Sequence, residues 1–147
     1  METANIETLN NLLKGEEMAI TSYSKFINEA SDESLKNEFK EIQKDHNKHS
    51  QLLSERIIEL GGTPRYGTGI AGVMADAKYT FESMGDRSNH DILKEAWHGE
   101  DQGVAMAEKV ADDKLDEKST RLVHDIMQVD HDHIKSLEKL IDKHRIQ

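Results

Sequence analysis

The sequence contains no cysteine, a single proline and no basic run at either end of its 147 residues. Without cysteine the chain can form neither a disulfide nor a thiolate metal site, so a bound metal would need carboxylate and imidazole ligands. No run of about eighteen apolar residues is present either, which a membrane-spanning helix would require. These absences exclude a disulfide-stapled scaffold, a sulfur-ligated metal site and a transmembrane helix.

Negative charge dominates the composition. The formal charge is −10 at pH 7, and 33% of the residues are charged. A chain this acidic is poorly suited to binding nucleic acid or anionic lipid. The first seven residues carry neither a basic region nor an apolar stretch, so we expect a freely soluble, cytoplasmic protein with no nucleic-acid or membrane partner.

The scarcity of proline and the abundance of Glu and Lys favour long α-helices over β-sheets. Apolar residues at steps of three and four predict helices over about residues 3–30, 33–60, 88–111 and 117–147. The second should end at Gly61-Gly62, followed by Pro64. A short extra helix is predicted inside the long connection 65–87. We therefore expect an all-α chain forming one domain over residues 1–147.

Two histidines interrupt the apolar face of the second predicted helix. His46 and His49 occupy the same face as Leu35, Phe39, Ile42, Leu53, Ile57 and Leu60. A buried polar ring without a partner costs on the order of 1–3 kcal/mol. These positions therefore call for hydrogen-bond partners or a metal.

The other three predicted helices carry polar residues at a matching level. Measured from a turn near residue 31, Glu17 and His46 both lie about 21 Å along their helices. Measured from a turn near residue 115, Glu100 and Asp130 both lie roughly 22 Å along theirs. The resulting metal-site prediction comprises Glu17, His46, His49, Glu100, Asp130 and His133, with Glu16 left open as the alternative to Glu17.

Carboxylates and imidazoles in this pattern suit iron or manganese, with zinc as a further option. One or two ions are compatible with six ligands, and a purely structural network of buried polar groups is the alternative. Tyr23 is close enough in sequence to Glu17 to approach the site, whereas Asp45 is expected at the surface. Gly99 and Gly103 flank Glu100 and predict a close approach to the helix backbone there.

Several segments resemble those of small bacterial ferritin-like four-helix proteins. They include Glu17 to Tyr23, His49 to Pro64, Ile92 to Asp101 and Asp130 to Glu138. More weakly, the combination is similar to a ferritin-like protein encoded with the general-stress (sigma-B) genes of Bacillus-type bacteria. The resemblance implies a bundle whose second and third long helices run parallel and are joined by a long crossover.

The resemblance also implies a di-iron or related centre. In such centres two helices each give a Glu, and the other two each give a Glu-x-x-His pair. Glu17, Glu100, His49 and His133 match this pattern, but His46 and Asp130 stand where the two remaining Glu residues would be. Three carboxylates leave a pair of divalent ions one charge short of neutrality, so a single ion or an asymmetric pair becomes credible.

Three functions compete on this evidence. The first is a ferritin-like protein that holds iron or manganese and oxidises Fe(II) with oxygen or peroxide, in a stress or iron-handling role. The second is a non-catalytic bundle that recruits a regulatory partner. The third, a storage cage, is disfavoured because no additional assembly helix follows the fourth. We expect a homodimer.

Overall fold

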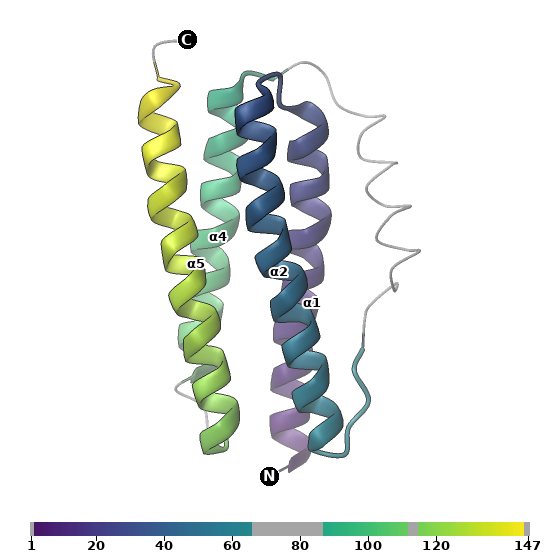
Figure 1. Cartoon of the computed structure of the whole chain (residues 1–147). Helices are drawn as coiled ribbons and strands as arrows, with labels where there is room; N and C mark the ends of the chain where they lie inside the picture. Colours follow the sequence, from purple (N-terminus) through teal and green to yellow (C-terminus); the bar gives the residue numbers. More distant parts are fainter. Residues whose placement is uncertain (1, 66–86, 112–114, 146–147) are drawn as a thin grey trace.

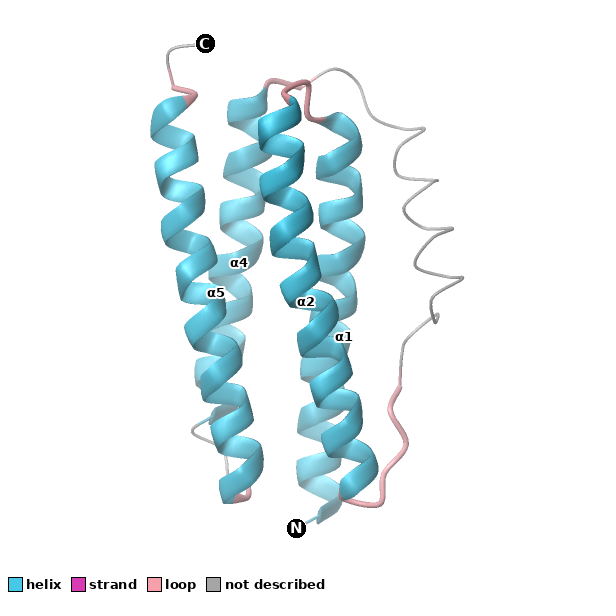
Figure 2. Cartoon of the chain, viewed as in Figure 1, coloured by secondary structure: helices cyan, strands magenta, loops and turns pink. Residues whose placement is uncertain are grey.

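The computed structural model describes residues 2–65, 87–111 and 115–145 of the chain. Within these residues there are four long helices and no strands (Figures 1 and 2). The helices are α1 (Glu2–Glu29), α2 (Glu33–Glu59), α4 (Asn89–Ala111) and α5 (Glu117–Lys143). Their bounds agree closely with those predicted from the apolar spacing, and the all-α prediction is confirmed.

The four helices form an elongated bundle in which α1 and α5 run one way and α2 and α4 the other (Figure 1). The hairpin partners α1 with α2 and α4 with α5 make the most extensive contacts, and α1 with α4 and α2 with α5 touch less. The predicted parallel pair, α2 and α4, is therefore present. The short extra helix predicted for residues 65–87 falls almost wholly outside the described residues.

Aspartates begin two of the helices, and a glycine ends one. Asp32 accepts a hydrogen bond from Ser34 N at 2.9 Å at the start of α2, and Asp116 accepts one from Ser119 N at 2.9 Å at the start of α5. Gly61 follows α2 with a φ of +85°, and its N–H bonds to the carbonyl of Ile58 at 2.9 Å. A residue with positive φ at the end of a helix is usually glycine, because a side chain would make this backbone conformation unfavourable.

Two apolar clusters fill the bundle, one towards each end. One combines Tyr23, Phe26, Ala30, Leu35, Phe39, Ile42, Ile92, Leu93, Ala96 and Leu137. The other combines Leu9, Leu13, Leu53, Ile57, Ala107, Val123 and Ile126. Between the two clusters lies a layer of buried polar residues, so the hydrophobic core is divided.

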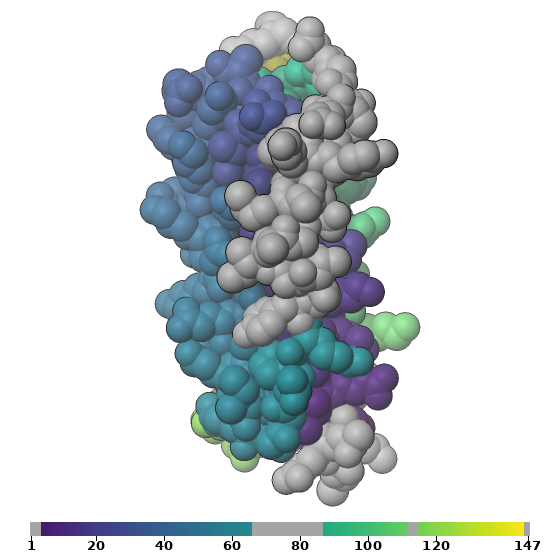
Figure 3. All heavy atoms as spheres, turned by 90° about the vertical axis from the view of Figure 1, so that its right-hand side faces the viewer, coloured from purple at the N-terminus to yellow at the C-terminus, as the bar shows by residue number. Residues whose placement is uncertain are grey.

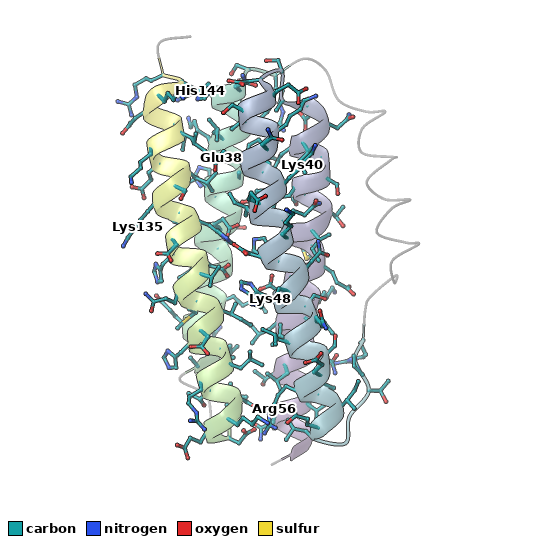
Figure 4. All side chains as sticks on the ribbon, viewed as in Figure 1. Glu38, Lys40, Lys48, Arg56, Lys135 and His144 are labelled. Carbon is teal, nitrogen blue, oxygen red and sulfur yellow. The ribbon has the colours of Figure 1, made fainter. Side chains whose placement is uncertain are left out.

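Charged side chains cover the outside of the bundle. Lys40 and Lys48 on α2 and Lys135 on α5 point away from the interior (Figure 4). Seen from the side, α2 extends along the length of one face (Figure 3). Among the described helices, none combines the length and the apolar content needed to cross a membrane.

The two glycines Gly61 and Gly15 give a matched test of these helix features. Gly61→Ala is expected to lower the free energy of unfolding by roughly 1 kcal/mol, because alanine resists a positive φ. Gly15→Ala is expected to raise it by up to about 1 kcal/mol, because Gly15 lies within α1 and an added Cβ meets nothing within 4 Å. Urea unfolding followed by circular dichroism measures both; equal effects of the two changes would contradict this account.

Candidate metal centre

The buried polar layer draws on all four helices. Its members are each less than one-tenth exposed: Glu16 from α1, His46 and His49 from α2, Glu100 from α4, and Asp130 and His133 from α5. They occupy the middle of the bundle because each continues the inward face of its helix at steps of three or four residues. The level predicted from the helix lengths is the level at which the structure brings these side chains together.

His46 lies at the centre of this layer. Its Nδ1 is 2.6 Å from Glu16 Oε2, and its Nε2 is 2.7 Å from Glu100 Oε1. When the ring is protonated, each N–H donates to one of these carboxylates. The imidazole therefore links α1 to α4 through two short, charge-assisted hydrogen bonds.

The remaining members fall into two groups around His46. Ligand atoms of Glu16, His46 and His49 lie within 4.8 Å of one another, and so do those of His46, Glu100, Asp130 and His133. His49 Nδ1 is 3.4 Å from Glu16 Oε1, while His133 Nδ1 is 3.4 Å from Glu100 Oε1 and 3.5 Å from Asp130 Oδ1. Within the described part of the chain these are the two clusters with metal-ligand geometry.

Three ligand atoms in this layer have no hydrogen-bond partner. His49 Nδ1, Asp130 Oδ1 and His133 Nδ1 are fully buried and unpaired, although an unsatisfied buried polar atom costs about 1–3 kcal/mol. His49 Nδ1 lies 3.8 Å and His133 Nδ1 3.5 Å from Asp130 Oδ1, and the two histidines belong to different groups. Divalent cations bound to these atoms would remove that cost, so the donor set fits metal binding.

Burial and contacts with neighbouring groups shift the pKa of each cluster residue in opposite directions. Burial alone would raise the pKa of Glu100, but contacts with His133 and His46 lower it to about 2. Burial disfavours the charged form of His133, but the carboxylates of Asp130 and Glu100 raise its pKa to about 10. The pKa of His46 is likewise raised well above its usual value by Glu100 and Glu16, despite burial. In the metal-free protein, protons therefore neutralise part of the carboxylate charge.

Asp130 behaves differently from the other two carboxylates. Its burial raises its pKa, and the nearby charges of Glu16 and Glu100 add to that rise, with His133 opposing it. A cation beside Asp130 would reverse the balance by favouring the ionised carboxylate.

Two residues outside the predicted ligand set hold its members in place. The hydroxyl of Tyr23 donates to Glu100 Oε1 at 2.8 Å, and its ring stacks on His46 with centroids 5.5 Å apart. Asp45 Oδ2 lies 2.7 Å from His133 Nε2, although the Asp45 side chain is 47% exposed. Sequence reasoning placed Tyr23 near the site but missed Asp45, because its contact is made across the α2–α5 interface.

On α1 the structure brings Glu16, not Glu17, to the histidines. Glu17 is also buried, and burial raises its pKa. Among the described residues, however, its carboxylate does not pair with His46 or His49 and is not part of either group. The sequence did contain a signal: Ile6, Leu9, Leu13, Glu16, Ile20, Tyr23 and Ile27 alternate strictly between steps of three and four. Glu17 breaks that alternation.

A groove of about 440 Å³ between α1 and α4 reaches the cluster from the surface. Small residues line it, including Gly15 and Ala19 on α1 and Gly99 and Gly103 on α4, and Glu16, His46, Glu100 and Asp130 are among its walls. A Cβ added to Gly99 or Gly103 would meet nothing within 4 Å. The predicted close approach to this backbone is therefore wrong among the described residues, and the glycines leave open space instead.

Comparison with known proteins places this chain in a family. The model of a domain of unknown function, DUF2383, matches residues 4–113, which is most of the chain. The chain belongs to the DUF2383 family. No protein of curated function matches this DUF2383 chain significantly.

Two solved structures share the fold of this DUF2383 protein. A two-domain protein from Anabaena variabilis ATCC 29413, with DJ-1/ThiJ/PfpI-like and ferritin-like domains, is 18% identical with a TM-score of 0.86 over 97% of this chain, which spans 40% of that protein. The bacterioferritin-related protein of Bacteroides fragilis, a dodecameric thioferritin, is 22% identical with a TM-score of 0.79. The match covers 99% of this chain and 89% of the Bacteroides chain. The ferritin-like fold expected from the sequence is confirmed.

Exchanging the two neighbouring glutamates of α1 tests which one is the ligand. Glu16→Gln is expected to weaken binding of Mn(II) at least about tenfold, since it removes the carboxylate nearest His46 and His49. Glu17→Gln should change the affinity less than about twofold. Isothermal titration of both variants with Mn(II) makes the comparison, and the reverse order of effects would assign Glu17 instead.

The shifted histidines predict a specific pH dependence of stability. A histidine with a folded pKa of about 10 and an unfolded one of about 6.5 contributes its full stabilisation below pH 6.5 and loses it as the pH rises towards 10. The melting temperature of the metal-free protein should therefore fall by on the order of 5 °C between pH 6.5 and 9.

Added metal should show the opposite trend, because ions compete with the same protons. The rise in melting temperature on adding metal should become larger between pH 6.5 and 9. Thermal scans with chelator and with Mn(II) measure both, and the exposed His124→Gln variant serves as a control. A metal-free melting temperature that rises with pH would contradict the protonated cluster.

Proposed function

We propose that this protein binds iron or manganese in the buried layer formed by Glu16, His46, His49, Glu100, Asp130 and His133. The observation that carries the proposal is the presence of three unpaired buried atoms in this one layer, His49 Nδ1 and His133 Nδ1 lying 3.8 Å and 3.5 Å from Asp130 Oδ1. Natural proteins seldom leave buried polar atoms without partners. Oxygen and imidazole donors without sulfur favour Fe(II), Mn(II) or Zn(II) over softer ions.

The proposal extends to oxidation of Fe(II) by oxygen or peroxide, in a stress or iron-handling role. A bound iron would supply the one-electron chemistry that amino-acid side chains lack. The groove between α1 and α4 provides a route by which a small oxidant reaches Glu100 and Asp130. Tyr23 and Asp45 contact Glu100 and His133 and would hold these two side chains in position beside a bound ion.

A non-catalytic, partner-recruiting bundle is the second candidate. One observation favours it: the pairing of His46 with Glu16 and Glu100 satisfies both ring nitrogens without any metal. In that case the polar layer would be a structural network, and a regulatory partner would bind elsewhere on the bundle.

Assembly and location belong to the proposal as well. The Bacteroides neighbour is a dodecamer, which supports association of this chain with copies of itself. A homodimer and a cytoplasmic location remain our predictions from the sequence.

Metal content decides between the two candidates. Protein purified without a histidine tag and exposed anaerobically to Fe(II) or Mn(II) should retain one or two ions per chain by elemental analysis. The His46→Ala, His49→Ala double variant should lose at least one of them, while the exposed His124→Ala, His131→Ala pair should lose none. Retention by the wild type and both variants alike would place the ions elsewhere.

Oxidation is a separate measurement on the same samples. Fe(II)-loaded wild-type protein should consume oxygen faster than free Fe(II) under the same conditions, and the double variant should not. Metal retention without faster consumption would leave a metal-binding protein that is not an oxidase. No retained metal in the wild type would favour the partner-recruiting bundle.

A further inference from the structure

The six ligand residues form two groups that share only His46. We define the first-hairpin subsite as Glu16, His46 and His49, and the second-hairpin subsite as His46, Glu100, Asp130 and His133. We propose that His46 bridges two divalent metal ions, with its Nδ1 in the first-hairpin subsite and its Nε2 in the second-hairpin subsite. This inference rests on the proposed metal binding and adds the number of ions and the way they are linked.

The directions of the two ring nitrogens carry the first step. Nδ1 lies 2.6 Å from Glu16 Oε2 on α1, and Nε2 lies 2.7 Å from Glu100 Oε1 on α4. The two nitrogen lone pairs of an imidazole diverge in the plane of the ring, so one ion cannot be bound by both. Each nitrogen instead has a carboxylate of its own, from a different hairpin.

The unpaired atoms carry the second step, because each subsite contains at least one of them. His49 Nδ1 is unpaired in the first-hairpin subsite, 3.4 Å from Glu16 Oε1. Asp130 Oδ1 and His133 Nδ1 are unpaired in the second-hairpin subsite, 3.5 Å apart. A single ion in one subsite would leave an orphaned atom in the other.

Charge carries the third step. Glu16, Glu100 and Asp130, each less than one-tenth exposed, supply three negative charges, whereas two divalent ions bring four positive charges. Uncompensated charge in such an environment is costly. When two metal–nitrogen bonds form, both N–H protons of His46 pass to solvent through the groove that His46 lines, the ring becomes an imidazolate with one negative charge, and the site is neutral.

The charge of a bridging imidazolate also accounts for the presence of His46 where the Glu-x-x-His pattern has a glutamate. A bridging glutamate would supply the fourth negative charge as a carboxylate, and His46 supplies it as an imidazolate. The two N–H groups that now donate to Glu16 and Glu100 occupy the directions in which the two ions would lie. Protons thus hold the places of the metals in the metal-free protein.

The separation of the two ions distinguishes this arrangement from a carboxylate-bridged pair. An imidazolate bridge holds its ions roughly 6 Å apart, since a metal–nitrogen bond of about 2 Å extends from each side of the ring. Carboxylate-bridged pairs lie about 3.5–4 Å apart. The difference is large enough to be read directly from metal positions in a crystal.

Crystals of the full chain loaded with Zn(II), which does not change oxidation state, provide the test. Anomalous difference maps should show two peaks roughly 6 Å apart on opposite sides of the His46 ring. Two peaks at about 3.5–4 Å, or one peak only, would overturn the bridge while leaving the proposed metal binding intact. No peak, in a protein that also retains neither Fe(II) nor Mn(II), would overturn both.

Variants test the bridge in solution without a crystal. His46→Gln should reduce bound Zn(II) from about two ions per chain to about one, because the first-hairpin subsite is left with two ligands. His49→Ala should do the same by emptying that subsite alone, and the exposed His124→Gln should retain two. Two ions retained by a folded His46→Gln protein, checked by circular dichroism, would overturn the proposal.

His46→Glu is the matched reversal, because it recreates the Glu-x-x-His spacing with His49. It should keep two Zn(II) ions and bring them to about 3.5–4 Å from each other. An unchanged separation of roughly 6 Å in this variant would show that the ring does not set the distance.

Discussion

The structure depends on a polar layer that cuts the hydrophobic core in two. Burying a continuous apolar face would cost these helices the least free energy, yet six ionisable side chains interrupt that face at one level. They are tolerated because nearly every one has an opposite charge within reach, with His46 paired on both sides. Removing one partner would leave a buried charge uncompensated, so the cluster behaves as a unit.

This constraint links fold and function. The same carboxylates that pair with protonated histidines in the metal-free protein are the groups that would hold a cation, and the residual unpaired atoms mark what the protons leave unsatisfied. The bundle suits such a layer, since each of its four helices contributes one or two of the six side chains. The groove between α1 and α4 exposes that centre to small molecules without opening the bundle.

Much of this could be predicted from the sequence, and the failures have physical reasons. Helix periodicity identified four helices, and matching distances from two turns placed Glu100 and Asp130 at the level of His46. The rotation of α1 was harder, because Glu16 and Glu17 both follow apolar residues by three or four positions. Only strict alternation along the whole helix selects Glu16. Contacts between helices lay further out of reach: nothing in the α2 sequence shows that a half-exposed Asp45 would meet His133 of α5.

The division of the ligands between the hairpins bears on how the protein is made. Glu16, His46 and His49, three of the six residues of the polar layer, all belong to the α1–α2 hairpin and are synthesised before α4 and α5. The α4–α5 hairpin reaches the ribosome exit only later, and it brings Glu100 to the open nitrogen of His46. The first hairpin therefore emerges with half of the polar layer, and the second hairpin completes that layer when the two halves of the bundle associate.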